Sequence, residues 1–236
     1  MELSNFQIPF RSGALHGSIT SAASGGAPRA LALHGGGRST RQGFQPLLTS
    51  LAERGFSSAS FDFHGHGESV GSLADSSLQH RAEQVLAVAE GLQLPRPVSL
   101  IASSMGGHVA CSLIAALAPS ALVLYCPAAY EDAAQTAPFG PSFQAIIRAT
   151  TSFSRSPAFD ALEKFEGRLL LVLGTEDAVI PKAVEHEYAT RARMARRVEI
   201  LRLEGAGHHL HAWLSARPSE FERVASRVLA TLEDRA

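Results

Sequence analysis

The sequence has few cysteines, almost no net charge and no long run of apolar residues. Its 236 residues include two cysteines, Cys111 and Cys126, which are too few for a disulfide framework and favour a reducing compartment. A formal net charge of −1 provides no basic field that would attract nucleic acid. No apolar run approaches the roughly 18–20 residues that span a bilayer. The N-terminus lacks the basic and apolar regions of a signal peptide. These absences predict a cytoplasmic protein with no membrane span.

The chain does contain short apolar runs that alternate with amphipathic stretches. We expect strands at 30–33, 56–63, 97–102, 121–125, 168–173 and 198–203. Apolar residues at helical spacing predict helices over 44–51, 78–89, 105–118 and 183–195, and a closing helix from Pro218. This alternation predicts one α/β domain over residues 1–236, with a mostly parallel sheet covered by helices on both faces. Ligands of such sheets bind beyond the carboxyl ends of the strands.

One stretch, residues 126–166, breaks this alternation. It contains several prolines and the aromatic residues Tyr130, Phe139, Phe143, Phe153 and Phe159 between two expected strands. A long connection inside a compact domain is usually functional, so we expect a lid or cap over the site. The alternative is a surface excursion with a small core of its own.

A serine lies between an expected strand and an expected helix, in the segment A-S-S-M-G-G. Ser104 has Gly106 and Gly107 on its far side, close to the G-x-S-x-G nucleophile elbow, with Ala102 in place of the first glycine. A nucleophile elbow holds its serine in a strained turn with the hydroxyl exposed. The alternative is that Ser104, or Ser103 beside it, only caps the helix.

The segment L-A-L-H-G-G-G ends an earlier strand with a glycine-rich turn. Such a turn can direct a backbone N–H at a developing oxyanion, together with the N–H of the residue after the nucleophile. We therefore expect Gly36 and Met105 to form an oxyanion hole, with Gly35 as the second choice for the loop donor. An ordinary glycine turn without a catalytic role is the alternative.

An acid and a histidine follow two later strands. Asp177 lies in G-x-x-D-x-x-I-P after the most apolar strand, and His208 lies in a glycine-rich loop after the last strand. A serine hydroxyl needs a positioned base, and an acid can orient that base. We expect Ser104, Asp177 and His208 to form a catalytic triad, with the adjacent Glu176 and His209 as rivals.

Pairs and clusters of histidine also raise the question of metal. His64 and His66 lie two residues apart, and three more histidines cluster at 208, 209 and 211. No carboxylate or cysteine stands at helical metal-ligand spacing near them, so we expect no metal site.

Taken together, these motifs resemble the α/β-hydrolase superfamily from His34 to the G-A-G-H loop at Gly205. F-D-F-H-G-H-G-E-S, residues 61–69, is similar to its D-x-x-G-x-G-x-S loop. Within the superfamily, the chain looks most like the small intracellular serine esterases and acylglycerol-hydrolase relatives. The resemblance implies a three-layer fold with about eight mostly parallel strands and a short cap, and no cofactor.

The same resemblance implies hydrolysis of an ester or related acyl bond through an acyl-enzyme. The expected lid offers aromatic surface but is too short for a large second domain, so we expect a small-to-medium carboxylic ester. The expected partner is therefore a small-molecule ester. A thioesterase, lactonase or peptidase with the same triad is an alternative. So is a non-catalytic binding protein with this fold.

Overall fold

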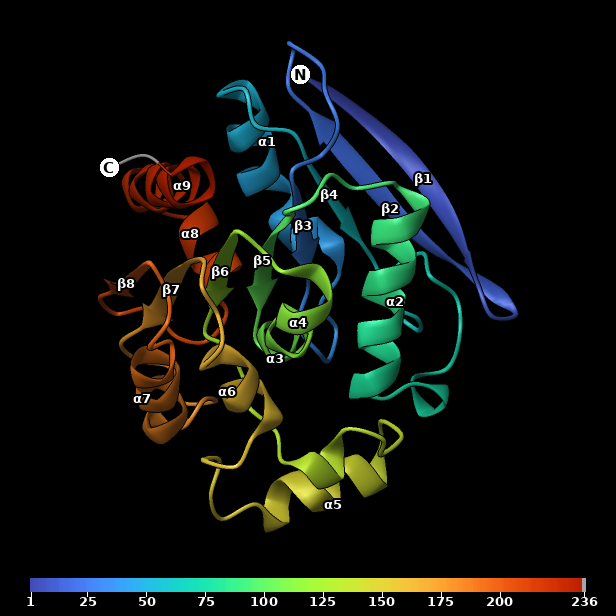
Figure 1. Cartoon of the computed structure of the whole chain (residues 1–236), viewed down its shortest axis with the longest axis vertical. Coiled ribbons are helices and arrows are strands. Elements are labelled where there is room, and N and C mark those ends of the chain that lie inside the picture. Colours follow the sequence, from blue (N-terminus) through green and yellow to red (C-terminus); the bar gives the residue numbers. More distant parts are fainter. Residues whose placement is uncertain (235–236) are drawn as a thin grey trace.

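Eight strands form one sheet in the order β1-β2-β4-β3-β5-β6-β7-β8 in the computed structural model, which describes residues 1–234 (Figure 1). β1 and β2 pair as an antiparallel hairpin, β2 is antiparallel to β4, and every other neighbouring pair is parallel. The predicted fold class is therefore confirmed. The strands are β1 (Glu2–Phe10), β2 (Gly13–Ser21), β3 (Ala30–Leu33), β4 (Ser58–Phe61), β5 (Ser99–Ser103), β6 (Ala121–Tyr125), β7 (Arg168–Gly174) and β8 (Arg197–Leu203).

Helices form a layer on each face of this sheet (Figure 1). One layer contains α1 (Gln45–Glu53), α8 (Leu210–Ser215) and α9 (Pro218–Glu233), and α9 contacts the other two. The other contains α2 (Leu78–Gly91), α3 (Met105–Ser112), α4 (Ile114–Leu117), α6 (Pro157–Leu162) and α7 (Lys182–Arg191). All residues of β3, β6 and β7 are buried, as expected for strands covered on both sides.

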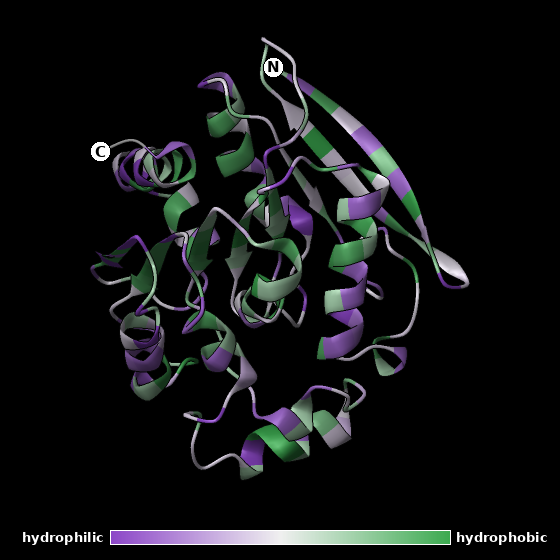
Figure 2. Ribbon diagram, in the orientation of Figure 1, coloured by the Kyte–Doolittle hydropathy of each residue, from purple (hydrophilic) through white to green (hydrophobic). Residues whose placement is uncertain are grey.

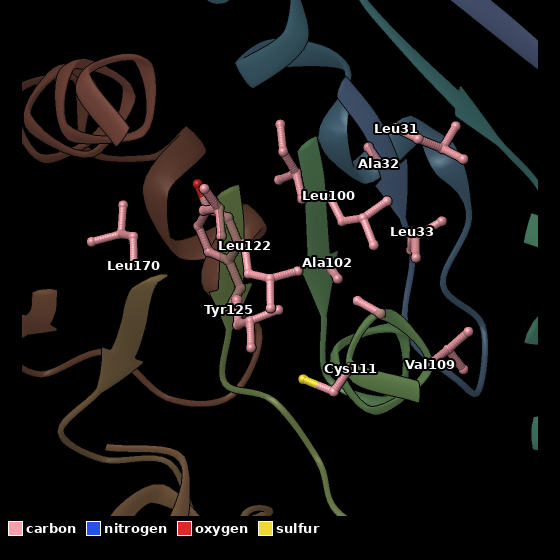
Figure 3. Close-up of a cluster of buried hydrophobic side chains, with 14 of the residues drawn as sticks. Leu31, Ala32, Leu33, Leu100, Ala102, Val109, Cys111, Leu122, Tyr125 and Leu170 are labelled. Carbon is pink, nitrogen blue, oxygen red and sulfur yellow. The ribbon is translucent and has the colours of Figure 1, made fainter. Parts of the chain in front are cut away.

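Part of the core lies between the sheet and α3. Leu33, Leu100 and Leu122 come from three adjacent strands and lie in one cluster with Val109 and Cys111 of α3 (Figure 3). Figure 2 shows the contrast between these apolar central strands and α9, which carries hydrophilic residues along its exposed side. Burial of this apolar surface is the main force that fixes the strand order.

Several elements are shorter than the sequence predicts. The helix expected over 183–195 ends at Arg191, and the strand expected from Pro97 begins at Ser99. The strand expected over 56–63 is hydrogen-bonded only over Ser58–Phe61, because the chain turns away at Asp62, whose side chain binds a neighbouring loop. The helix expected over 105–118 is interrupted at Leu113, whose N–H bonds to the carbonyl of Ala110 in a tight turn. Three further helices are present that the periodicity did not predict: α5 (Pro141–Ala149), α6 and α8.

The buried face of α2 agrees only in part with the apolar pattern that predicts the helix. Of the apolar residues in that pattern, Leu78 and Val85 are buried, whereas Ala82, Leu86 and Ala89 are only partly covered. The helix also buries Arg81, Gln84 and Val88. A charged residue, Arg81, therefore points into the protein from the first turns of this helix.

The carboxyl ends of the parallel strands meet at one edge of the sheet, where α5 and the loops of residues 126–166 also lie (Figure 1). The other described helices lie against the two sheet faces. Within residues 1–234, no helix combines the length and the apolar character needed to cross a bilayer.

Candidate active site

Ser104 occupies a strained turn between β5 and α3. Its φ of 52° and ψ of −119° lie in a region that non-glycine residues rarely adopt. Hydrogen bonds to both of its backbone groups hold it there: its N–H donates to the carbonyl of Tyr125, and its carbonyl accepts from Gly107 and Ala128. This geometry matches the predicted nucleophile elbow and presents the hydroxyl at the end of β5.

Small residues allow the strand and the helix to approach at this turn. A methyl group on Gly106 would lie 2.4 Å from the carbonyl oxygen of Leu33, and one on Gly107 would lie 2.7 Å from Cβ of Pro127. Any side chain at these positions would push the helix away from the sheet. Ala102, which replaces the first glycine of the motif, is fully buried in β5, so the methyl group fits there.

The three residues predicted to form a triad lie together at the carboxyl ends of their strands. Nδ1 of His208 is 2.8 Å from Oδ2 of Asp177, and Nε2 of His208 is 3.0 Å from Oγ of Ser104. The other oxygen of Asp177 accepts hydrogen bonds from the N–H groups of Val179 and Ile180. The chain of hydrogen bonds therefore runs from a fixed carboxylate through an imidazole to a hydroxyl.

The rival residues do not take part in this chain of hydrogen bonds. Glu176 and His209 are both exposed at the surface. The ring of His209 packs edge-on against that of His208, with centroids 5.7 Å apart, and lines the cleft. The geometry thus favours Asp177 and His208 over their neighbours.

The ionisation of Asp177 suits this arrangement. Burial by itself would raise the pKa of Asp177, but hydrogen bonds from His208, the N–H of Ile180, the Cys126 thiol and the N–H of Val179 together hold it below its ordinary value. A carboxylate accepts only, so Nδ1 of His208 must carry the proton that it donates to Asp177. Nε2 is then free to accept the proton of the Ser104 hydroxyl.

Cys126 is a neighbour of the triad that the sequence did not reveal. It follows β6, has a φ of 40°, and burial raises the pKa of its thiol. Its Sγ lies within 4.8 Å of the ligand atoms of Asp177 and His208, the one cluster of possible metal ligands among residues 1–234. Both nitrogens of His208 are already hydrogen-bonded, so a metal ion here would compete with its bonds to Asp177 and Ser104.

The loop after β3 lies against the elbow. A methyl group on Gly35 would lie 3.2 Å from Cβ of Ser104, and one on Gly36 would lie 3.1 Å from Cε of Met105. The backbone N–H groups of Gly36 and Met105 donate no hydrogen bond to another atom of residues 1–234. Two free N–H groups beside a serine hydroxyl can bind a developing oxyanion.

Residues 61–69 hold the loop between β3 and α1 through hydrogen bonds to Asp62. Asp62 accepts hydrogen bonds from the backbone N–H and the guanidinium of Arg41, and the backbone of Glu68 also bonds to it. Gly67 has a φ of 49°, and a methyl group there would lie 2.2 Å from a carboxylate oxygen of Asp62. The hydroxyl of Ser69 donates to the backbone carbonyl of Asp62. This segment therefore fixes the β3–α1 loop and does not reach the serine.

A cleft of about 710 Å³ opens above Ser104. Its walls combine the glycine-rich loop, the loop that carries His208 and the start of α8. Of residues 126–166, only Tyr130 lines it in the described structure. The polar walls are Arg38, Ser39, Thr40, Gln42, His209 and Ser215, and the apolar walls are Phe44, Pro46, Met105, Tyr130, Val179 and Leu210.

Residues 126–166 are attached to the domain through α2 and α3. The N–H of Gln79 in α2 donates to the carbonyl of Gln135, and Nε2 of His108 in α3 lies 3.2 Å from Oε1 of Gln135. The ring of His108 also packs edge-on against Tyr130, with centroids 5.1 Å apart. His108 itself is fully buried, and its Nδ1 has no hydrogen-bond partner within residues 1–234.

Acid should destabilise the protein through this histidine. Burial lowers the pKa of His108 to about 4, although the hydrogen bond to Gln135 opposes the shift. In the unfolded chain the ring titrates near its ordinary value of 6.5. Between these two values the unfolded state binds the proton and the folded state does not, so stability present above pH 6.5 is lost as pH falls towards 4.

We expect His108→Leu to flatten this dependence. The slope of the unfolding free energy against pH should fall by about 1.4 kcal/mol per pH unit across that window. Urea unfolding followed by circular dichroism at a series of pH values measures the slope. His186→Leu, at an exposed position on α7, is the control and should leave the slope unchanged. Equal slopes for His108→Leu and wild type would contradict this account.

Known proteins resemble this chain in sequence over part of its length. Alpha/beta hydrolase domain-containing protein 17C of Homo sapiens is 29% identical over 159 residues, which are 64% of this chain and 43% of that protein. Protein 17B of Homo sapiens is also 29% identical, over 64% of this chain and 49% of that protein. The chain thus spans less than half the length of these relatives.

Solved structures resemble it over nearly its whole length. The thioesterase domain from the curacin biosynthetic pathway has a TM-score of 0.71 at 18% identity, covering 98% of this chain and 100% of that chain. Est1E from Butyrivibrio proteoclasticus with bound ferulic acid has a TM-score of 0.69 at 17% identity, covering 94% and 99%. The model of the family Hydrolase_4, described as serine aminopeptidase, S33, matches residues 27–156, more than half of the chain. The chain therefore belongs to this family of α/β hydrolases.

Proposed function

We propose that the protein is a serine hydrolase that cleaves a small-to-medium carboxylic ester. One observation carries the proposal: an unbroken chain of hydrogen bonds from Asp177 through His208 to Ser104, at 2.8 and 3.0 Å, with the serine held in a strained turn beneath an open cleft. A helix-capping serine has no need of a base at hydrogen-bonding distance. The arrangement is that of a nucleophile activated by an oriented base.

The reaction proceeds in two acyl-transfer steps. Nε2 of His208 takes the proton of Ser104 as Oγ attacks the substrate carbonyl, and the carboxylate of Asp177 stabilises the resulting imidazolium. The N–H groups of Gly36 and Met105 bind the oxyanion. His208 then protonates the leaving alcohol, and an acyl-enzyme remains. Water, deprotonated by the same histidine, releases the acid and restores Ser104.

The cleft supports a substrate of modest size. Its volume of about 710 Å³ lies within the range of small-molecule pockets, and its walls mix apolar and polar side chains. In this proposal, residues 126–166 act as a lid whose Tyr130 already contacts the cleft. The buried, unpaired cysteines support the expected cytoplasmic location.

Labelling with a fluorophosphonate tests the proposal directly. We expect a single adduct on the peptide that contains Ser104, found by mass spectrometry in wild type and absent in Ser104→Ala. Ser112→Ala on α3, whose hydroxyl bonds to the carbonyl of Val109, is the matched control and should label normally. A folded wild-type protein without an adduct would contradict the proposal and favour a binding role.

A substrate panel then tests the ester preference. p-Nitrophenyl esters from acetyl to dodecanoyl should give turnover that depends on Ser104, with an optimum at short or medium chains. Faster turnover of a thioester, a lactone or an aminoacyl p-nitroanilide by the same serine would keep the mechanism and change the substrate class.

A further inference from the structure

The peptide that joins Gly35 to Gly36 is fixed from its carbonyl side. The carbonyl oxygen of Gly35 lies 2.8 Å from Nδ1 of His34 and 3.2 Å from Nη1 of Arg81. The N–H of Phe63 donates to Nε2 of His34, so Nδ1 carries the proton and donates to Gly35. Burial, above all, lowers the pKa of His34, which keeps this ring neutral. Two donors therefore hold one carbonyl.

Fixing this carbonyl also fixes the N–H of Gly36. A peptide group is planar, and in the trans form its C=O and N–H point in opposite directions. This peptide is trans, because the cis bond recorded in the chain is Arg96–Pro97. With the Gly35 oxygen held against Arg81 in the interior, the Gly36 N–H points the other way, towards the cleft that Gly36 lines.

Arg81 is an unusual residue to find in this place. Its side chain is 1% exposed, and it makes no ion pair with a carboxylate of the described residues. Its Nη2 lies 3.2 Å from Nε2 of His66, and its guanidinium lies over the rings of Phe63 and Phe139, 4.6 and 4.8 Å from their centroids. Burial lowers the pKa of Arg81 to about 10, which leaves it charged at neutral pH.

A buried cation without a carboxylate partner costs free energy, and aromatic faces offset only part of that cost. The Arg81 guanidinium would stabilise a negative charge that forms nearby during the reaction, because the guanidinium is buried and water screens its charge only weakly. The oxyanion of the proposed reaction is such a charge, on the opposite side of the Gly35–Gly36 peptide.

We propose that Arg81 is a positioning residue for the oxyanion hole: its guanidinium holds the Gly35 carbonyl so that the Gly36 N–H faces the oxyanion. This inference rests on the proposed serine hydrolase function. It also links the hole to residues 126–166, because Phe139 covers the guanidinium from that segment.

Kinetics of Arg81 variants test the role. We expect Arg81→Met to lower kcat for p-nitrophenyl acetate by about 10²-fold, the low end for loss of an oxyanion donor, with KM nearly unchanged. Arg81→Lys keeps the charge and one donor and should lose about 10-fold. Arg168→Met is the matched control, since Arg168 is also buried and binds the carbonyls of Thr231 and Leu232. It should keep the wild-type kcat.

A thionoester separates positioning from general damage. Sulfur in place of the carbonyl oxygen accepts hydrogen bonds weakly, so the oxyanion hole assists it less. Arg81→Met should therefore lose much more activity on the oxoester than on the thionoester. Equal losses on both substrates, or a wild-type kcat in Arg81→Met, would overturn the role of Arg81.

Two further results decide the remaining cases. If Arg81→Met does not fold, the oxoester and the thionoester are compared with Arg81→Lys. A ratio of oxoester kcat to thionoester kcat equal to that of wild type would then overturn the proposal. If wild type itself shows no turnover dependent on Ser104, the proposed function fails, and the role of Arg81 fails with it.

Discussion

His208→Ala is expected to lower kcat for ester hydrolysis by about 10⁶-fold, the scale found when the base of a serine triad is removed. Without Nε2 at 3.0 Å from Oγ, the Ser104 hydroxyl keeps its proton and remains a poor nucleophile. The leaving alcohol also loses its proton donor. Stopped assays with p-nitrophenyl acetate, corrected for spontaneous hydrolysis, measure the loss.

The adjacent histidine provides the comparison. His209→Ala removes a ring that lines the cleft and packs against His208, so we expect a change in kcat of less than about tenfold. Similar losses in the two variants would mean that the loop, and not one imidazole, is what catalysis requires. A loss confined to His209→Ala would transfer the role of base to that residue.

The sequence predicted the candidate triad because each member is marked by a local motif. Ser104 lies in an elbow, Asp177 in G-x-x-D-x-x-I-P and His208 in a glycine-rich loop, and each follows a strand. The parallel sheet then brings the carboxyl ends of those strands to one edge. Local pattern and sheet topology together predict that these three side chains lie close to one another, and the structure places them at hydrogen-bonding distance.

Arg81 and Cys126 have no such motif. Arg81 lies three residues after Leu78 and four before Val85, which is the spacing of one helix face, so its burial could have been suspected. Nothing local shows that this face meets the Gly35 carbonyl, because that contact depends on how α2 packs. Cys126 ends up beside Asp177 only because β6 and β7 are neighbours. Contacts set by packing are not encoded in short motifs.

The sequence pattern also did not predict where several helices and strands begin and end. The apolar run over 56–63 continues past the residues that pair in β4, because Phe63 is buried beyond them, where its ring packs against those of His34 and Phe61. Residues 126–166 have no clear period, and hydrogen bonds from α2 and α3 to Gln135 help to fix their position. Their proposed role as a lid stays a prediction.

Replacing the acid by its amide is the second large effect that we expect. Asp177→Asn should lower kcat by about 10⁴-fold with little change in the fold. The N–H groups of Val179 and Ile180 both donate to Oδ1 of Asp177 and require an acceptor there. The asparagine must therefore place its carbonyl oxygen on them and its NH₂ group against Nδ1 of His208.

That orientation selects the wrong tautomer of the histidine. Facing an NH₂ donor, Nδ1 must accept, so the proton moves to Nε2 and the ring can no longer take the proton of Ser104. Glu176→Gln, one residue away and exposed, makes the same chemical change outside the triad and should keep kcat within about tenfold of wild type. Thermal unfolding and fluorophosphonate labelling of both variants would show whether a loss comes from the site or from the fold. If Asp177→Asn kept more than a tenth of wild-type kcat, its carboxylate would act only as a cap for the turn at Val179 and Ile180, and the orienting acid would have to be sought at Glu176.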